Sequence, residues 1–227
     1  MSDIAENIRL LKEELPAGVR LVAVSKTREP EDIMEAYNAG QRVFGENRVQ
    51  ELMGKYELVP RDIQWHMIGH LQRNKVKYII DFIHMIESVD SLKLLRAINK
   101  EALKAERVVD CLLQFHIARE ETKFGFSPEE VREMMESGVA GELNNVRIRG
   151  VMGMATFTDD MERVRKEFIF LRSVYDSLKE KYFSTDDFSY ISMGMSNDYK
   201  IALEEGSNMI RLGTSIFGAR SCKTNNN

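Results

Sequence analysis

The sequence is poor in cysteine and has no pattern of metal ligands. Its two cysteines, Cys111 and Cys222, lie far apart, one in the apolar run VVDCLLQFHI and the other in a polar C-terminal stretch. This placement fits neither a disulfide framework nor a zinc site. The four histidines form no HxH or HExxH motif; they are His66, His70, His84 and His116. We therefore expect no structural or catalytic metal.

The sequence also lacks a membrane-spanning segment. No apolar run approaches the ~20 residues that a transmembrane helix needs, and the N-terminal MSDIAENIRLLKEE has no apolar core of a secretion signal. Basic residues do not outnumber acidic ones, since 32 Lys and Arg against 36 Asp and Glu leave a net charge of −4. Such a chain has no overall basic field to recruit nucleic acid. These absences predict a cytoplasmic protein that binds neither membranes nor nucleic acid.

Short β-branched runs alternate with amphipathic helical stretches along the whole chain. Strands are predicted at 20–24, 42–44, 63–68, 83–87, 108–117, 147–152, 189–193 and 208–212. Helices are predicted at 3–14, 30–39, 46–57, 72–80, 90–105, 127–137, 160–181 and 196–205, with a short one in TSIFG. Ser127 and Pro128 are typical of a helix start, and Gly40, Gly138 and Gly206 stand where helix C-terminal caps are expected.

Eight strands joined by crossover helices indicate a parallel α/β fold. No composition break divides the chain, so the pattern favours a single (β/α)8 TIM-type barrel over residues 1–220, with an extra N-terminal helix. An open doubly wound sheet is the alternative. The last residues, 221–227, are polar and end in KTNNN, which predicts a disordered tail.

Three features follow predicted strands at the end where barrel enzymes carry their chemistry. Lys26 follows the first strand, SMGMSND follows the seventh and RLGTSIFG includes and follows the eighth. Loops after strands seven and eight often hold a phosphate in such barrels. Ser196 is predicted as a helix N-cap whose hydroxyl can donate to a phosphate, and Gly213 and Thr214 allow close backbone approach. Neither GxGxxG nor GxxxxGK[ST] occurs.

A lysine beside a phosphate site suggests a Schiff base with a phosphorylated aldehyde. A neutral lysine amine attacks carbonyl groups, and a pocket of low polarity favours that neutral form. Pyridoxal 5′-phosphate (PLP) is the cofactor that best fits such a site. A class I aldolase acting on a sugar phosphate is an alternative for the same lysine. The residues alone therefore predict a barrel with a reactive lysine and a phosphate site.

Several motifs together resemble the pyridoxal phosphate homeostasis protein family. They are AVSKT, FGENRVQE, WHMIGHLQRNK, ETKFGF, GVMGMA and SMGMSNDYKIALEEGSNMIRLGTSIFG. The resemblance covers about residues 5 to 220. It implies a single barrel similar to the N-terminal domain of alanine racemase and PLP bound through the lysine of AVSKT.

Carried over by position, the resemblance makes Lys26 the Schiff-base lysine and places the PLP phosphate on Ser196, Gly213 and Thr214. It directs Arg211 at the pyridine nitrogen. Three further residues match family motifs near the same mouth: Asn47, His66 and Lys123. For His66 a buried core histidine, and for Lys123 an exposed loop lysine, are the alternatives.

The resemblance implies a cofactor-handling protein and not an enzyme. An arginine facing the pyridine nitrogen leaves it unprotonated, which weakens the ring as an electron sink. Racemases work with such an arginine, but they add a second acid–base residue from a further domain, and we expect this chain to lack that domain. The predicted role is PLP homeostasis, by buffering the free aldehyde and delivering it to PLP-dependent apoenzymes, and a monomer is favoured. A PLP-dependent amino-acid racemase or lyase is the alternative function.

Overall fold

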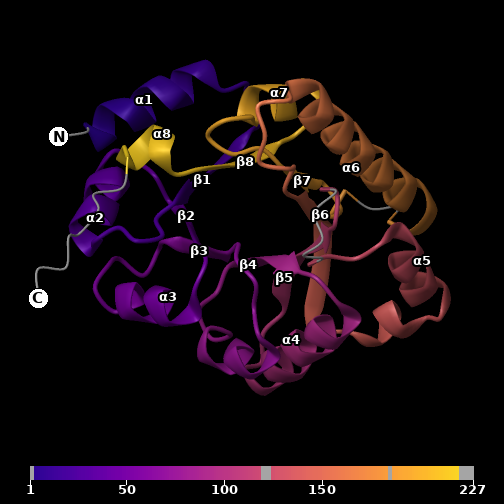
Figure 1. Cartoon of the computed structure of the whole chain (residues 1–227). Helices are drawn as coiled ribbons and strands as arrows, with labels where there is room; N and C mark the ends of the chain where they lie inside the picture. The colour runs from indigo at the N-terminus through magenta and orange to yellow at the C-terminus, as the bar shows by residue number, and fades with distance from the viewer. Residues whose placement is uncertain (1–2, 119–123, 184–185, 220–227) are drawn as a thin grey trace, which may run out of the picture.

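The structure, a computed structural model, closes eight parallel strands into one barrel (Figure 1). It describes residues 3–118, 124–183 and 186–219. Each strand pairs with the next in parallel, and β1 pairs with β8 to close the ring. The strands are β1 (Arg20–Val24), β2 (Val43–Glu46), β3 (Gln64–Met67), β4 (Met85–Val89), β5 (Val109–Phe115), β6 (Val146–Gly153), β7 (Tyr190–Ser192) and β8 (Met209–Leu212). The closed barrel is confirmed and the open-sheet alternative was wrong.

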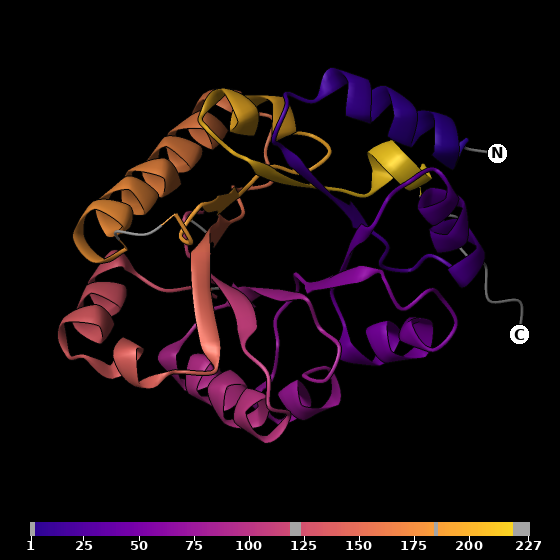
Figure 2. The same ribbon diagram turned by 180° about the vertical axis from the view of Figure 1, so that it is seen from behind.

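Helices surround this barrel on the outside, as Figure 2 shows from the opposite end. They are α1 (Ile4–Glu14), α2 (Pro30–Asn38), α3 (Val49–Tyr56), α4 (Leu92–Lys104), α5 (Pro128–Glu136), α6 (Met161–Tyr182), α7 (Tyr199–Glu204) and α8 (Thr214–Phe217). Two 3₁₀ helices, η1 (Arg73–Tyr78) and η2 (Val139–Glu142), complete the set. No described helix is long and apolar enough to cross a membrane. Lys123 and the predicted disordered tail lie outside the described residues.

Local sequence signals explain several helix ends. Ser127 accepts a hydrogen bond from the amide of Glu130, and the Glu130 carboxylate accepts one from the amide of Ser127, which forms a capping box at the start of α5. Gly40, Gly138 and Gly206 have φ angles of +84°, +78° and +92°. Only glycine adopts such left-handed backbone readily, so these three predicted C-terminal stops are confirmed.

Most predicted ends are shifted by one or two residues, and three elements differ more clearly from the prediction. The helix predicted at 72–80 is the 3₁₀ helix η1, in which Lys75 N–H bonds Gln72 O and the following Ile79 N–H bonds Val76 O. The helix predicted from residue 196 begins at Tyr199, because the preceding turn is closed by the Asp198 carboxylate, which accepts from the Met195 amide at 2.6 Å. Strand β2 continues to Glu46, where a helix start was predicted, because its pairing with β3 reaches Met67.

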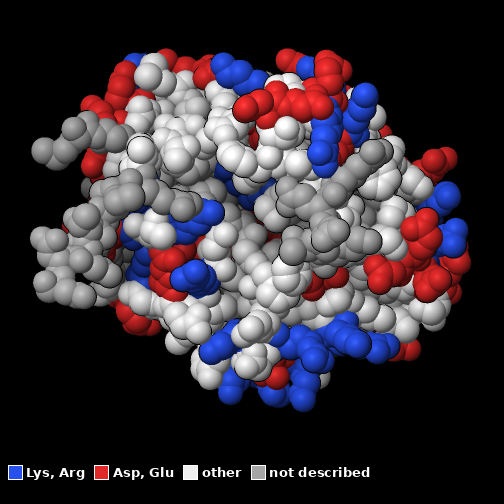
Figure 3. All heavy atoms as spheres, viewed as in Figure 1, with Lys and Arg blue, Asp and Glu red and all other residues white. Residues whose placement is uncertain are grey.

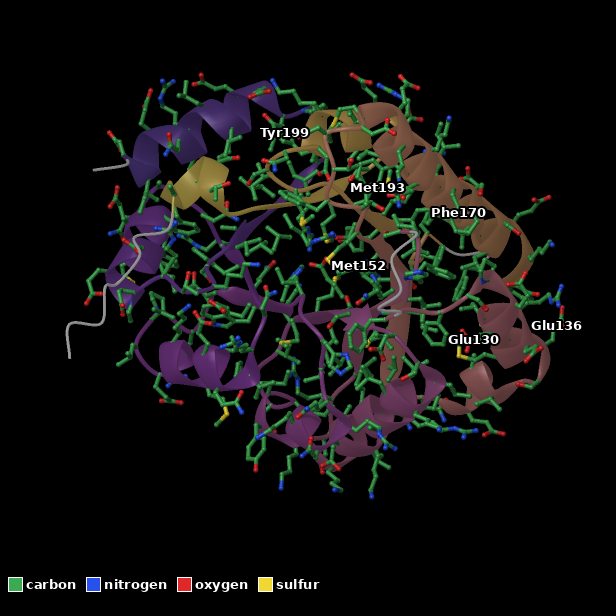
Figure 4. The ribbon with its side chains drawn as sticks, viewed as in Figure 1. Glu130, Glu136, Met152, Phe170, Met193 and Tyr199 are labelled. Carbon is green, nitrogen blue, oxygen red and sulfur yellow. The ribbon has the colours of Figure 1, made fainter. Side chains whose placement is uncertain are left out.

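The barrel interior is divided into an apolar layer and a polar layer. Alternate strand residues fill the apolar layer: Val22, Met85, Leu112, Met152 and Met209, with Val43 and Tyr190 beside them. In Figure 4 the Met152 side chain lies inside the ring of strands. Two residues further along their strands, buried Glu87, Ser192 and Arg211 form the polar layer towards the C-terminal ends. A larger apolar cluster packs the helices onto the outside of the strands.

Truncation of one interior side chain tests this layering. Leu112 is fully buried in the apolar layer, so Leu112→Ala should lower the free energy of unfolding by about 2–5 kcal/mol through lost burial and the cavity left behind. The matched control is Leu103→Ala on α4, where the leucine is 62% exposed and the expected change is within about 0.5 kcal/mol. Urea unfolding of both variants measures the difference. Equal effects would show that Leu112 is not part of a packed interior.

Candidate functional site

A cavity of about 720 Å³ opens at the C-terminal end of the barrel. Figure 3 views the molecule from this end and shows its surface hollowed near the middle. The cavity is lined by Lys26 after β1, by Arg211 on β8, by residues 155–159 after β6, and by the segments 195–198 and 213–214 that follow β7 and β8. Five of the predicted site residues therefore share one cavity: Lys26, Ser196, Arg211, Gly213 and Thr214.

Lys26 lies in a tight turn directly after β1. The Arg28 amide donates to the Ser25 carbonyl at 3.0 Å, which closes the turn around Lys26 and Thr27. Thr27 has a φ of +63°, in the left-handed region that a β-branched residue rarely adopts. Lys26 itself is half-buried and lines the cavity. The strand end and this turn together bring its side chain to the mouth of the barrel.

The segments after β7 and β8 contact each other on the β8 side of the cavity, where β8 pairs with β1. The Gly213 amide donates to the Ser196 hydroxyl at 3.4 Å. Ser196 was predicted to be the N-cap of α7, and this was wrong. Its hydroxyl instead joins the loop after β7 to the loop after β8. The first hydrogen bonds within α8 are donated by the Ile216 and Phe217 amides to the Gly213 carbonyl. The Thr214 and Ser215 amides come before these donors, so they make no hydrogen bond within the helix. This wall combines the Ser196 hydroxyl with the Thr214 amide, a donor set suited to an anion, while the Gly213 amide donates to Ser196.

A buried polar network fixes Arg211. Its Nη1 donates to the Ser192 hydroxyl at 2.5 Å and its Nη2 to the Gly153 carbonyl at 2.9 Å. Ser192 in turn donates to Glu87 Oε2 at 2.5 Å, and Glu87 Oε2 lies 3.8 Å from Arg211 Nη1. The two arginine bonds use two of the five N–H groups of a guanidinium. Arg211 is therefore held rigidly while it also faces the cavity.

The charges of this network compensate for burial. Burial alone would raise the pKa of Glu87, but the hydrogen bond and charge of His66, the charge of Arg211 and the Ser192 hydroxyl hold it below its ordinary value. Burial lowers the pKa of Arg211, and the carboxylates of Glu87 and Asp198 oppose that shift. The pair of opposite charges lets both groups stay deep in the barrel, where a single charge would be costly.

Two predicted residues lie elsewhere. His66 is fully buried on β3, and its Nδ1 lies 2.6 Å from Glu87 Oε1. It reaches Arg211 only through Glu87 and Ser192. Asn47 follows β2, and its Oδ1 is buried with no hydrogen-bond partner among the described residues. The described lining of the cavity includes neither residue.

Other lining residues were missed in the sequence. Arg28, Asp198 and the loop after β6 line the cavity, and Phe157 of that loop is 85% exposed. Burial raises the pKa of Asp198, against the effect of the Met195 amide and the Arg211 charge. The signal available was position, since the loop GMATFTDD follows a predicted strand at the same end of the barrel. Among the described residues no group of three His, Cys, Asp or Glu side chains could hold a metal.

Comparison with known proteins identifies relatives over the whole length of the chain. The family model described as alanine racemase, N-terminal domain, matches residues 1–221. The pyridoxal phosphate homeostasis protein of Aquifex aeolicus is 41% identical over 224 residues, which cover 97% of this chain and 96% of that protein.

Two solved structures are also similar to this chain. PipY of Synechococcus elongatus PCC7942, solved with PLP bound, superimposes with a TM-score of 0.87 at 35% identity, over 95% of this chain and 100% of that one. Alanine racemase of Clostridium difficile 630 has a TM-score of 0.75 at 15% identity, over 97% of this chain and 58% of that one. This second likeness concerns the fold alone, and it confirms a barrel like that of the racemase N-terminal domain.

The partly buried His84 gives a prediction about stability in acid. Burial, with the charges of His66 and Arg20, lowers the pKa of His84 to about 4. Between pH 6.5 and 4 the unfolded state then binds more protons at this position, so the free energy of unfolding decreases as the pH falls. His84→Gln removes that term. From pH 7 to 4.5 the variant should lose about 1–2 kcal/mol less than the parent, allowing for screening at this half-buried site. Urea unfolding at both pH values measures the two losses of free energy of unfolding. Equal losses in the variant and its parent would contradict the prediction.

Proposed function

This chain belongs to the pyridoxal phosphate homeostasis protein family, and on that premise we propose that it holds PLP as a Schiff base on Lys26, buffering the cofactor and delivering it to apoenzymes. One observation carries the proposal. Lys26, the Ser196–Gly213–Thr214 wall and Arg211 converge on a single cavity. An amine, an anion site and a planar cation are the three groups that the aldehyde, phosphate and pyridine ring of PLP require.

The donor set fits the cofactor. Ser196 and the backbone of Gly213 and Thr214 would hold the phosphate, and Arg211 would lie opposite the pyridine nitrogen. When bound, PLP supplies an aldehyde that condenses with the Lys26 amine to a C=N bond with loss of water. Val24 and Met161 also line the cavity and give part of its wall an apolar surface. Lys26 is half-buried at the mouth of the cavity, so water would have access to its amine and to a bond formed there, which would allow release of the cofactor.

Arg211 supports a role in holding PLP over one in amino-acid chemistry. A guanidinium donates hydrogen bonds and accepts none, so a pyridine nitrogen facing it is favoured in its unprotonated form. The ring is then a poor electron sink for carbanions. Glu87, Ser192 and the Gly153 carbonyl fix the arginine in place, so it cannot turn away from the cavity without breaking buried hydrogen bonds.

Loss of the lysine amine tests the covalent anchor. Wild-type protein mixed with PLP should develop a visible absorbance band that borohydride reduction fixes on the peptide containing Lys26. Lys26→Ala should show neither the band nor the fixed label, because it lacks the amine. Lys104→Ala is the matched control, since Lys104 makes an exposed ion pair with Glu101 on α4. A label of unchanged yield in Lys26→Ala would place the anchor elsewhere.

Exchange of substrate protons separates holding from catalysis. Protein loaded with PLP should exchange the α-proton of L-alanine for deuterium in D₂O no faster than free PLP at the same concentration, because Arg211 does not favour the protonated ring. Proton NMR measures the exchange, and circular dichroism of the recovered alanine measures racemisation. Exchange at least a hundredfold above free PLP would favour the racemase or lyase alternative.

A further inference from the structure

A second buried cluster of charges lies outside the cavity, between β1, β2 and α3. Lys55 of α3 is 6% exposed, and its Nζ donates to three oxygens at 2.7 Å: the Ser25 carbonyl, Glu46 Oε1 and Glu51 Oε1. These acceptors match the three N–H groups of an ammonium. Ser25 also donates its hydroxyl to Glu46 Oε1 at 2.7 Å. We call Glu46, Glu51 and Lys55 the α3 clamp.

The α3 clamp holds the backbone on both sides of Lys26. Before Lys26, the Ser25 carbonyl accepts from Lys55. After Lys26, the Thr27 amide donates to Glu51 Oε1. The Glu51 oxygen that accepts from Thr27 also accepts from Lys55, so one carboxylate links the two sides. The peptide units that flank Lys26 are thus tied to a helix that contributes nothing to the described lining of the cavity.

The turn at Lys26 needs such a tie. Its third residue, Thr27, has a φ of +63°, where glycine or asparagine is the usual choice in a turn of this kind. A β-branched residue keeps this conformation only when its surroundings determine it. Thr27 is exposed, so little apolar packing holds it, and the hydrogen bond that its backbone N–H donates to the Glu51 carboxylate supplies a constraint. Loss of that bond would leave the Ser25 carbonyl, held by the Arg28 amide and by Lys55, as the remaining tie. The direction of Lys26 would then be less constrained.

We propose that Glu51 and Lys55, with Glu46 as their buried partner, are positioning residues that aim Lys26 at the cofactor aldehyde. The inference rests on the proposed function and adds residues that touch neither cofactor nor cavity. The step they assist is addition of the Lys26 amine to the aldehyde carbon, in which C=N replaces C=O and one water molecule leaves. Burial raises the pKa of Glu46, which Lys55 and Ser25 counteract, so the clamp depends on its internal pairing.

Glu51 is the position to test, because its side chain is 24% exposed and can be changed without leaving a fully buried charge unpaired. Glu51→Ala removes the acceptor of the Thr27 amide, whereas Glu51→Gln keeps an oxygen that can accept from it. The matched control is Glu57→Ala, which breaks only an exposed ion pair with Arg61 next to the same helix. All variants are compared below their unfolding midpoints, so that each is folded.

Two measurements distinguish a misdirected Lys26 from general damage to the cavity. Stopped-flow absorbance gives the rate of Schiff-base formation with PLP. Equilibrium binding of pyridoxine 5′-phosphate, which has the ring and phosphate but no aldehyde, reports on the rest of the cavity. In Glu51→Ala the rate should fall about tenfold or more, since small displacements of a reacting group are costly. Its affinity for pyridoxine 5′-phosphate should stay within about twofold, and Glu51→Gln and Glu57→Ala should react at about the wild-type rate.

The other possible outcomes would each contradict a stated part of the proposal. A wild-type rate in Glu51→Ala would overturn the α3 clamp. Equal losses of rate and of pyridoxine 5′-phosphate affinity would also overturn it, because they indicate general damage to the cavity. Failure of Glu51→Gln to restore the rate would exclude the Thr27 bond as the cause. Absence of any borohydride-fixed label on Lys26 in the wild type would instead refute the proposed function, which keeps the two failures distinct.

Discussion

Closure of the sheet between its first and last strands is the constraint on which the site depends. Strand β1 pairs with β8 in parallel, with Val22 beside Arg211 and Ala23 beside Leu212. Because both strands point the same way, the residues that follow them emerge side by side at one end of the barrel. Lys26 and Gly213 thus lie on one cavity although they come from opposite ends of the chain. An open sheet with these strands at its two edges would have separated the Lys26 amine from Gly213 and Thr214.

The same end of the barrel carries two buried charge networks, and each contains an ion pair of opposite charges. On the inside, Glu87 offsets Arg211 and also contacts His66. Outside the strands, Glu46 and Glu51 offset Lys55. Buried ion pairs contribute little to stability compared with well-packed apolar groups, but loss of one partner is strongly destabilising. Such networks therefore favour a fixed arrangement over a more stable one, and these two fix the guanidinium and the turn at Lys26.

The sequence allowed the order of strands and helices, the closed barrel and five cavity residues to be predicted. Arg211 was predicted only from the family resemblance. The other features depend on local signals: hydrophobic period, glycine caps, and the position of Lys26, Ser196 and the Gly213–Thr214 loop after strands. The networks depend on pairing between strands distant in sequence, and single-sequence periodicity carries no such information. Glu87 and Ser192 read as ordinary polar residues, and Glu46 was assigned to a helix because its strand ends in polar residues. For His66 a buried core position was one of two alternatives predicted from the sequence, but its contact with Glu87 could be found only in the folded barrel.

The two networks also bear differently on the proposed function. Arg211 concerns how the ring would be held, and its fixed charge disfavours the electron withdrawal that amino-acid chemistry needs. The α3 clamp concerns how readily the lysine would meet the aldehyde, a step that both a carrier and an enzyme require. A protein that buffers a reactive aldehyde benefits from fast and reversible capture without further reaction. Under the proposed function, an aimed lysine would accelerate capture of the aldehyde, and a fixed arginine would leave the captured cofactor a poor electron sink for reactions of amino acids.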